Sequence, residues 1–440
     1  MPNMDRRAVL VGSGALAVAG MARAQGLAYD LIIKGGTVVD PSQTLNAIRD
    51  VGIKNGVVKA VQAGLNPADA VQVYDATGKI VTPGLIDLHA HVWPGGNYLG
   101  TAPDTLMLAE LTTTVVSPGD AAAQSVGAFR QSVVSASTAR VLGFIQISKA
   151  AFFTFPHSET PNLDYLNATD AANALIANSD ILLGVKVRES FSVIGNFDLA
   201  PLQRAIDACT MATNATGIPF KVMCHIGGLR TPALMGDIIN LLRPGDIITH
   251  AFVGYPNQAS VATGLAQNFQ GIPAAFTAKQ KGIVLDCGWG GSPAGQPVIG
   301  GSFDYLTAMI CQVAGLRLDT LSSDSHAFTP STGGRMHLTE VMSNFLNLND
   351  WANVTPQLGS GSVTPPVGLE DVVRMTTNTP GQVIGRIPTL GTLQIGAPGD
   401  VAIMQLVQGS FTFNDTMGHT LSASQKLIPI KAVKAGALVG

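Results

Sequence analysis

Eight short apolar runs, each followed by a longer segment of helical character, most constrain the fold of this chain of 440 residues. A repeating order of strand and helix predicts a parallel sheet, and eight repeats can close it into a (β/α)8 barrel of the TIM type. An open parallel sheet is the alternative, but ligand-type side chains follow the strands at the ends where barrel active sites gather. The predicted strands are residues 80–87, 112–117, 140–147, 182–187, 219–224, 246–249, 282–286 and 320–322.

The two ends of the chain have a different pattern, of short alternating runs separated by glycine turns. Residues 27–78 and 386–440 are both typical of small antiparallel hairpins. We therefore predict one small β-sandwich domain built from both chain ends, beside a barrel domain of residues 79–385. Residues 349–368 are rich in Pro, Gly, Ser and Thr, which indicates a loop inserted in the barrel.

The composition is typical of a large buried core. Hydrophobic residues make up 46% of the chain and charged residues 12%, which argues against disorder. A net charge of −3 without any basic run argues against nucleic acid as a partner. The four cysteines permit a disulfide, but Cys224 and Cys287 lie in apolar runs that favour buried thiols.

The first 24 residues have the features of an export signal that is cleaved. Arg6 and Arg7 precede an apolar segment that ends in Ala22-Arg23-Ala24, which has the pattern of a cleavage site. The adjacent arginines resemble a bacterial twin-arginine (Tat) signal and predict a periplasmic or secreted protein. The apolar segment is short for a membrane span, so an uncleaved anchor is the weaker alternative.

Two histidines follow the first predicted strand. His89 and His91 are separated by one residue, and in an extended strand this spacing directs both imidazoles to one face. Both rings can then bind a single metal ion. Two histidines with this spacing are by themselves weak evidence for a metal site, because histidines at strand ends often make only structural hydrogen bonds.

Other ligand-type residues follow later strands. His225 follows the fifth predicted strand, His250 the sixth and Asp324 the eighth. Taken singly, such a histidine is usually hydrogen-bonded in the core, and such an aspartate often caps a helix. Because the carboxyl ends of all strands meet at one face of a barrel, the whole set predicts a metal centre there.

Lys186 lies inside the apolar run of the fourth predicted strand. Burial of an ammonium group is costly, so it lowers the pKa of a lysine and favours the neutral amine. A neutral amine can add carbon dioxide to form a carbamate, an anionic oxygen ligand able to bridge two divalent metals. The alternative is a lysine whose charged end reaches solvent. The histidines that follow the other strands favour the interpretation of Lys186 as a metal ligand.

These motifs together resemble the amidohydrolase superfamily, and more narrowly its amidohydrolase/deacetylase branch, which has a binuclear metal centre and is similar to dihydroorotase. The likeness extends over nearly the whole chain after the export signal. It rests on residues 83–91, 184–188, 225–227, 249–250, 323–326, 376–380, 390–393 and 399–401.

The resemblance implies a hydrolase with two divalent ions, of which zinc is expected first, although manganese, iron and cobalt suit the same ligands. A hydroxide shared by the two metals would attack the substrate carbonyl, and Asp324 would pass its proton to the leaving group. The implied ligands are His89 and His91 on the more buried ion, His225 and His250 on the more exposed ion, Asp324 on the first ion, and carbamylated Lys186 as the bridge.

The resemblance also implies hydrolysis of an amide or ester bond in a small N-acyl or O-acyl acid. Arg188 either binds a substrate carboxylate or pairs with an acidic neighbour such as Glu189. His326 is a candidate to orient Asp324. Trp289 stands where this branch commonly has a histidine, which implies either an apolar wall of the substrate pocket or drift in a surface loop.

Two other functions remain open. A cyclic-amide hydrolase of the dihydroorotase or hydantoinase type has the same metal architecture. A non-catalytic metal-binding protein on this fold would also keep the ligands, although the retained Asp324 counts against it. The expected partner is a small-molecule substrate, and the sequence leaves homo-oligomerisation open.

Overall fold

The computed structural model describes residues 26–153, 159–160, 162–229, 234–253, 272–290, 302–329, 336–354 and 361–440. The predicted export signal lies outside these ranges. Within them, no helix has both the length and the apolar character needed to cross a membrane.

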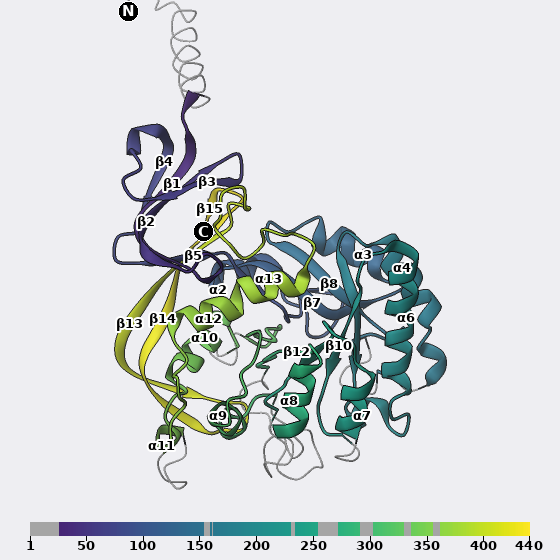
Figure 1. The fold of residues 1–440 in the computed structure, drawn as a ribbon. Helices are drawn as coiled ribbons and strands as arrows, with labels where there is room; N and C mark the ends of the chain where they lie inside the picture. Colours follow the sequence, from purple (N-terminus) through teal and green to yellow (C-terminus); the bar gives the residue numbers. More distant parts are fainter. Residues whose placement is uncertain are drawn as a thin grey trace, which may run out of the picture.

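The larger part of the molecule is a curled sheet of seven parallel strands with helices around it (Figure 1), which confirms the predicted α/β class. Neighbouring strands follow one another in sequence, from β6 at one edge to β12 at the other. The strands are β6 (Leu85–Asp87), β7 (Thr112–Ala122), β8 (Arg140–Gln146), β9 (Leu182–Arg188), β10 (Lys221–His225), β11 (Ile247–Thr249) and β12 (Val284–Leu285).

The predicted eighth strand, residues 320–322, is not a regular strand. Thr320 forms an isolated parallel bridge with Asp286, and Ser325 forms another with Ala90. Residues 320–325 therefore run between the chain that follows β12 and the chain that follows β6. The extended conformation is interrupted at Asp324, whose φ of 52° lies in the left-handed region.

Helices follow the strands of this sheet and pack their apolar faces on it. Asn167 caps one of them by accepting a hydrogen bond from the Asp170 amide, and Gly217 ends another at a φ of 73°. The predicted insertion at 349–368 contains a short helix, and its residues 355–360 lie outside the described ranges. The helices are α2 (Pro103–Glu110), α3 (Val126–Phe129), α4 (Ala168–Ala177), α5 (Phe191–Ile194), α6 (Ala200–Thr216), α7 (Leu234–Leu241), α8 (Ile272–Gln280), α9 (Tyr305–Val313), α10 (Leu338–Asn347), α11 (Trp351–Val354), α12 (Leu369–Thr376) and α13 (Asn378–Ile384).

A second sheet of eight strands combines the two chain ends, as their similar patterns predicted. N-terminal and C-terminal strands meet where β5 pairs antiparallel with β13. The strands are β1 (Tyr29–Asp40), β2 (Leu45–Lys54), β3 (Val57–Gln62), β4 (Ala70–Asp75), β5 (Ile80–Pro83), β13 (Val401–Asn414), β14 (Thr420–Lys434) and β15 (Ala437–Val439).

The prediction of one barrel strand over residues 80–87 was wrong, because the run divides at Gly84. Residues 80–83 form β5 of the eight-stranded sheet, and residues 85–87 form β6 of the parallel sheet. The chain crosses between the sheets where a Cβ on Gly84 would meet the Thr113 hydroxyl at 2.2 Å. An apolar β-branched run predicts extended backbone, but it does not specify the partner strand.

The long hairpin of β13 and β14 runs beside α10 and α11 to the start of α9 (Figure 1). At its tip, the His419 Nδ1 atom lies 2.9 Å from an oxygen of Asp415 and 3.1 Å from an oxygen of Asp304, the N-cap residue of α9. These two hydrogen bonds raise the pKa of His419 to about 10. The protonated imidazole therefore joins the hairpin tip to the helix.

Raising the pH is expected to remove the stability that His419 contributes. Because its folded pKa of about 10 exceeds the ordinary 6.5, the contribution is complete below pH 6.5 and is lost as the pH rises through about 10. Urea unfolding of the wild type and His419→Gln at pH 6, 8 and 10 measures it. The difference in midpoint should be largest at pH 6, and an equal difference at all three values would contradict the assignment.

Candidate metal centre

The polar residues predicted at the strand ends line a single cavity of about 130 Å³ at the carboxyl end of the parallel sheet. All six predicted metal ligands are among them, together with two of the three predicted substrate residues. The lining residues are His89, His91, Leu99, Phe152, Lys186, Arg188, His225, His250, Ser302, Asp324 and His326.

The first two histidines face the same carboxylate. His89 Nε2 lies 3.2 Å from Asp324 Oδ1, and His91 Nε2 lies 3.4 Å from the same oxygen. Each ring is held from behind, because His89 Nδ1 contacts the Thr249 hydroxyl at 2.9 Å and His91 Nδ1 contacts Asp120 at 2.7 Å. Burial alone would raise the pKa of Asp324, but the charge and hydrogen bonds of the two histidines lower it well below its usual range.

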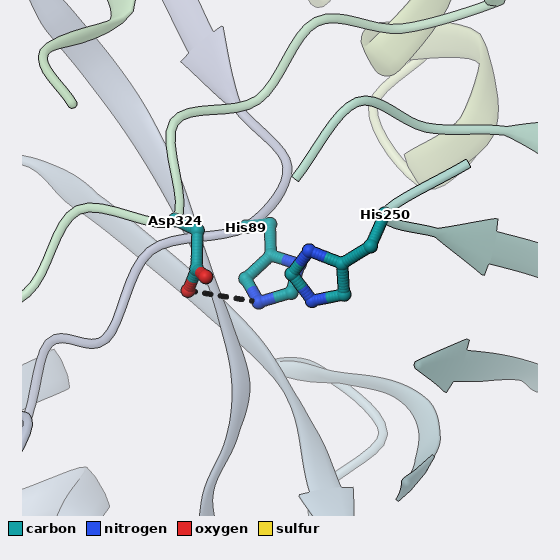
Figure 2. Close-up of side chains that lie close together, drawn as sticks. All are labelled: His89, His250 and Asp324. Carbon is teal, nitrogen blue, oxygen red and sulfur yellow. Dashed lines mark ion pairs between the residues drawn. The ribbon is translucent and has the colours of Figure 1, made fainter. Parts of the chain in front are cut away.

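His250 and His225 complete the cluster of imidazoles. The ring of His250 lies 5.0 Å from that of His89 and 4.3 Å from that of His225, measured between centroids. Figure 2 shows His89 and His250 side by side with Asp324 next to them. One ligand atom from each of these three residues lies within 4.8 Å of the other two, so the group could hold a metal ion.

Two of these residues have unusual backbone conformations. His250 has a φ of 62° and Asp324 a φ of 52°, in the left-handed region that non-glycine residues seldom adopt. Such conformations cost free energy and are found where the surrounding structure enforces them, most often at functional sites. Here the His250 ring is held by a 2.7 Å contact between Nδ1 and the Gly288 carbonyl oxygen.

Lys186 lines the cavity, and the residue is 1% exposed. Its Nζ atom is buried without a hydrogen-bond partner, which is costly for an ammonium group. Burial lowers the pKa of Lys186 to about 7, as the apolar run predicted. The position on β9 and the missing partner both leave the amine available to a ligand in the cavity.

These residues fit divalent metal ions. Imidazole nitrogens and a carboxylate oxygen are the usual donors to zinc, manganese, iron and cobalt. The supports behind the rings also fit, because histidines that bind a metal commonly use their second nitrogen on a carboxylate or hydroxyl group.

Those supporting residues were not found from the sequence. Asp120, near the end of β7, accepts hydrogen bonds from the Val92 amide and the Ser117 hydroxyl in addition to its contact with His91. Thr249 donates to Asp286 at 2.8 Å, and so links His89 to a buried carboxylate. In the sequence, the acidic residue near the end of the second parallel strand was the one feature that could have indicated such a support.

Arg188 takes the second of its two predicted roles, with a different partner. Its guanidinium pairs with Glu159, a buried residue from the segment after β8, and not with Glu189. Gln146 holds the second oxygen of Glu159 at 3.0 Å. Arg188 keeps 17% of its side chain exposed and still lines the cavity, so pairing does not remove it from the site.

Within the described ranges, Trp289 does not form an apolar wall of the cavity, which was one of its two predicted roles. It is 1% exposed, stacks on Phe303 at 4.1 Å between ring centroids, and is absent from the described lining of the cavity. His326 does line the cavity, and its Nδ1 accepts a hydrogen bond from the Phe328 amide. His326 was expected to orient Asp324, but the contacts of 3.2 and 3.4 Å to the Asp324 carboxylate come from His89 and His91.

The four thiols agree with the prediction of buried cysteines. Cys224 and Cys287 are fully buried, and so are the other two cysteines; none of the four forms a disulfide in the described structure.

No family model matches the chain, but individual proteins do. It is 26% identical over 384 residues to a deacetylase of Brucella anthropi, which covers 86% of this chain and 85% of that protein. A solved adenine deaminase has a TM-score of 0.76 at 25% identity and covers 93% of this chain and 99% of its own. A solved dihydroorotase has a TM-score of 0.77 at 22% identity, with coverage of 93% and 97%, and shows a shared fold.

A parallel sheet with histidines and an aspartate gathered at its carboxyl end defines an α/β enzyme with a candidate site for divalent metal. The likenesses extend over most of the chain and confirm the resemblance expected from its motifs. Over most of its length the chain is similar to enzymes of the amidohydrolase superfamily, and these likenesses indicate a hydrolase of that type.

Proposed function

We propose that this protein hydrolyses an amide or ester bond in a small acylated acid with the help of two divalent metal ions, zinc first among them. The observation that carries the proposal is the single cavity in which His89, His91, His225, His250, Lys186 and Asp324 meet. When bound, the metals would polarise the carbonyl group and make a nucleophile available at neutral pH.

Asp324 is the proton carrier in this proposal. Asp324 lines the cavity, and its low pKa keeps it in the ionised form, which is the form that accepts a proton during attack on the carbonyl. The same carboxyl group then delivers that proton to the leaving amine or alkoxide. His89 and His91 hold the carboxylate in place throughout.

Lys186 is proposed to carry a carbamate. Its amine would form a bond to the carbon of carbon dioxide and release one proton, which gives an anionic oxygen donor. Support comes from the buried Nζ atom, which has no other partner in the described structure. The carbamate would bridge the ion held by His89 and His91 and the ion held by His225 and His250.

The other proposals concern organisation and export. We infer that residues 320–325 close the parallel sheet into a (β/α)8 barrel, since they bridge toward both of its edges. The eight-stranded sheet would form the small β-sandwich domain, from residues 27–78 and 386–440. The arginine pair and apolar segment of residues 1–24 support export through the Tat route.

Arg188 is proposed to bind a carboxylate on the substrate, because it brings a guanidinium to the cavity wall and is oriented there by Glu159. The zinc-loaded protein is expected to hydrolyse N-acetyl derivatives of small amino acids or O-acetyl derivatives of small hydroxy acids, tested in both enantiomers. Dihydroorotate and hydantoins in the same assay test the cyclic-amide alternative. Activity on the ring compounds alone would show that the substrate is a cyclic amide and not an acylated acid. Activity on none of the compounds would favour a non-catalytic protein.

Replacing Arg188 with lysine tests the carboxylate contact. The variant keeps a positive charge beside Glu159 but loses the planar fork that binds a carboxylate with two hydrogen bonds. KM for N-acetylalanine should rise about 10-fold, which corresponds to the loss of one charged hydrogen bond. KM for N-acetylalanine amide, which has no carboxylate, is the internal control and should not change. An equal change for both compounds would show that Arg188 has only a structural role.

A further inference from the structure

Ser302 is a cavity residue with no assigned role. It is half-buried, lines the cavity, and has no hydrogen-bond partner in the described part of the chain. A hydroxyl group that faces a binding cavity without a protein partner can donate one hydrogen bond and accept others. The neighbouring residues show which part of a bound molecule it would meet.

Gly290 shows that the Ser302 hydroxyl lies close to Asp324. A Cβ placed on Gly290 would be 2.7 Å from Asp324 Oδ2 and also 2.7 Å from Ser302 Oγ. The two oxygens therefore flank one small space, which stays open because residue 290 is glycine with a φ of 61°. Asp324 delivers a proton to the leaving atom in the proposed mechanism, so Ser302 would lie beside the same atom.

The tip of the C-terminal hairpin holds the segment that carries Ser302. The Thr416 hydroxyl accepts a hydrogen bond from the Phe303 amide at 2.8 Å and donates to the Phe303 carbonyl oxygen at 2.6 Å. Asp415 accepts a hydrogen bond from the Tyr305 amide at 2.8 Å. The residues next to Ser302 are therefore bonded to a hairpin more than 100 residues later in the chain.

Trp289 supports the same segment from the other side. Its ring stacks on Phe303 at 4.1 Å between centroids, with 19° between the planes. Phe303 is fully buried between this ring and the hairpin tip, so its backbone has little freedom. Trp289, for which a place in the pocket wall was one of two predictions, thus packs on a residue next to the cavity lining.

We propose that Ser302 contacts the substrate at its leaving amine or alkoxide, and that Thr416 is a positioning residue which acts through Ser302. The inference rests on the proposed function, because the leaving atom is defined by that reaction. It gives the eight-stranded sheet a part in the active site, since its longest hairpin fixes one wall of the cavity.

A double-mutant cycle tests the proposal with N-acetylalanine and O-acetyllactate as probes. Ser302→Ala should lower kcat/KM about 10-fold, as expected for one lost hydrogen bond, and Ser302→Thr should restore most of it. Thr416→Val removes the two hydrogen bonds of the side chain to Phe303 at nearly constant shape, keeps the backbone bond, and should lower kcat/KM about 3- to 10-fold. In the Ser302→Ala background Thr416→Val should have no further effect, because the hydroxyl that it positions is gone.

Thr420→Val on the same hairpin is the matched control. Thr420 is exposed and its hydroxyl donates to Asn414 at 3.1 Å, within the hairpin itself, so kcat/KM should not change. Unchanged kcat/KM in Ser302→Ala would overturn the substrate contact. Multiplying losses in the double variant would overturn the positioning role, because a purely structural effect of Thr416 does not depend on the hydroxyl of Ser302.

A binding measurement separates this inference from the proposed function. Calorimetry of N-acetylalanine with zinc-loaded Asp324→Asn, with and without Ser302→Ala, should show about 10-fold weaker binding when the hydroxyl is absent. If the wild type hydrolyses neither probe, the proposed function is wrong, but the comparison of affinities still tests whether Ser302 contacts the bound compound. Equal affinity in the two proteins, or no binding in either, would overturn the contact.

Discussion

Replacing Asp324 with asparagine is expected to lower kcat by about 10³- to 10⁴-fold, within the range that a positioned acid or base contributes. The amide keeps the size of the carboxylate but cannot accept the proton and return it to the leaving group. Steady-state hydrolysis of the best acetyl compound measures the effect. The metal content, measured by mass spectrometry, should stay above one ion per chain because the four histidines remain.

Asp319→Asn provides the matched control for this prediction. Asp319 lies at the start of the segment that contains Asp324, at the end away from the cavity. Its Oδ1 atom lies 2.7 Å from Lys279 Nζ. Its replacement should leave kcat within about 2-fold, since a partly exposed ion pair contributes little. Full turnover by Asp324→Asn would exclude Asp324 as the proton carrier and would favour a protein that binds metal without catalysis.

Replacing Lys186 with methionine is expected to abolish hydrolysis and to leave the metal-free protein at least as stable as the wild type. Methionine fills nearly the same volume, while the Nζ atom that it removes is buried without a hydrogen-bond partner. Removal of such a group should stabilise the fold by about 1–3 kcal/mol. Bound metal should fall from two ions per chain to one or none, because the proposed bridge is lost.

The measurements are metal analysis after dialysis and urea unfolding without metal. Lys221→Met, on the neighbouring strand β10, is the control, because Lys221 lies outside the cavity. It should retain both metals and full activity. Two bound metals and normal activity in Lys186→Met would contradict the carbamate bridge.

The positions of the ligands around the cavity were predictable because each depends on local sequence. An apolar run followed by a histidine places that histidine at a strand end, whatever the rest of the chain does. The parallel order of strands then brings His89, His225 and His250 to one edge of the sheet. Lys186 was predictable for a related reason, since a lysine among apolar neighbours within a strand, together with histidines after the other strands, favoured a buried ligand.

The supports behind the ligands were not predictable in the same way. Asp120 reaches His91 from the neighbouring strand β7, and Glu159 reaches Arg188 from a segment 29 residues away. A carboxylate can pair with any cation within reach, so its partner depends on the packing of loops. The same reason explains why Glu189 was proposed for Arg188, whereas the structure has Glu159.

The division of residues 80–87 between two sheets also depended on tertiary structure. Both halves are buried and largely apolar, and they differ in the strands with which they pair, β1 and β13 for one half and β7 for the other. Likewise, the polar turn of the C-terminal hairpin gave no sign that its tip reaches the segment after Ser302. Such contacts join residues far apart in sequence, and turn residues are polar whether or not they have a distant partner.

The sequence by itself determined the α/β class, the joining of both chain ends in one sheet, and the set of residues that meet in the cavity. These follow from periodicity and from the chemistry of single side chains, which are local properties. Only the tertiary structure decided which groups support those residues, where Trp289 packs, and that the C-terminal hairpin holds one wall of the cavity. These depend on distances between segments that the sequence keeps far apart.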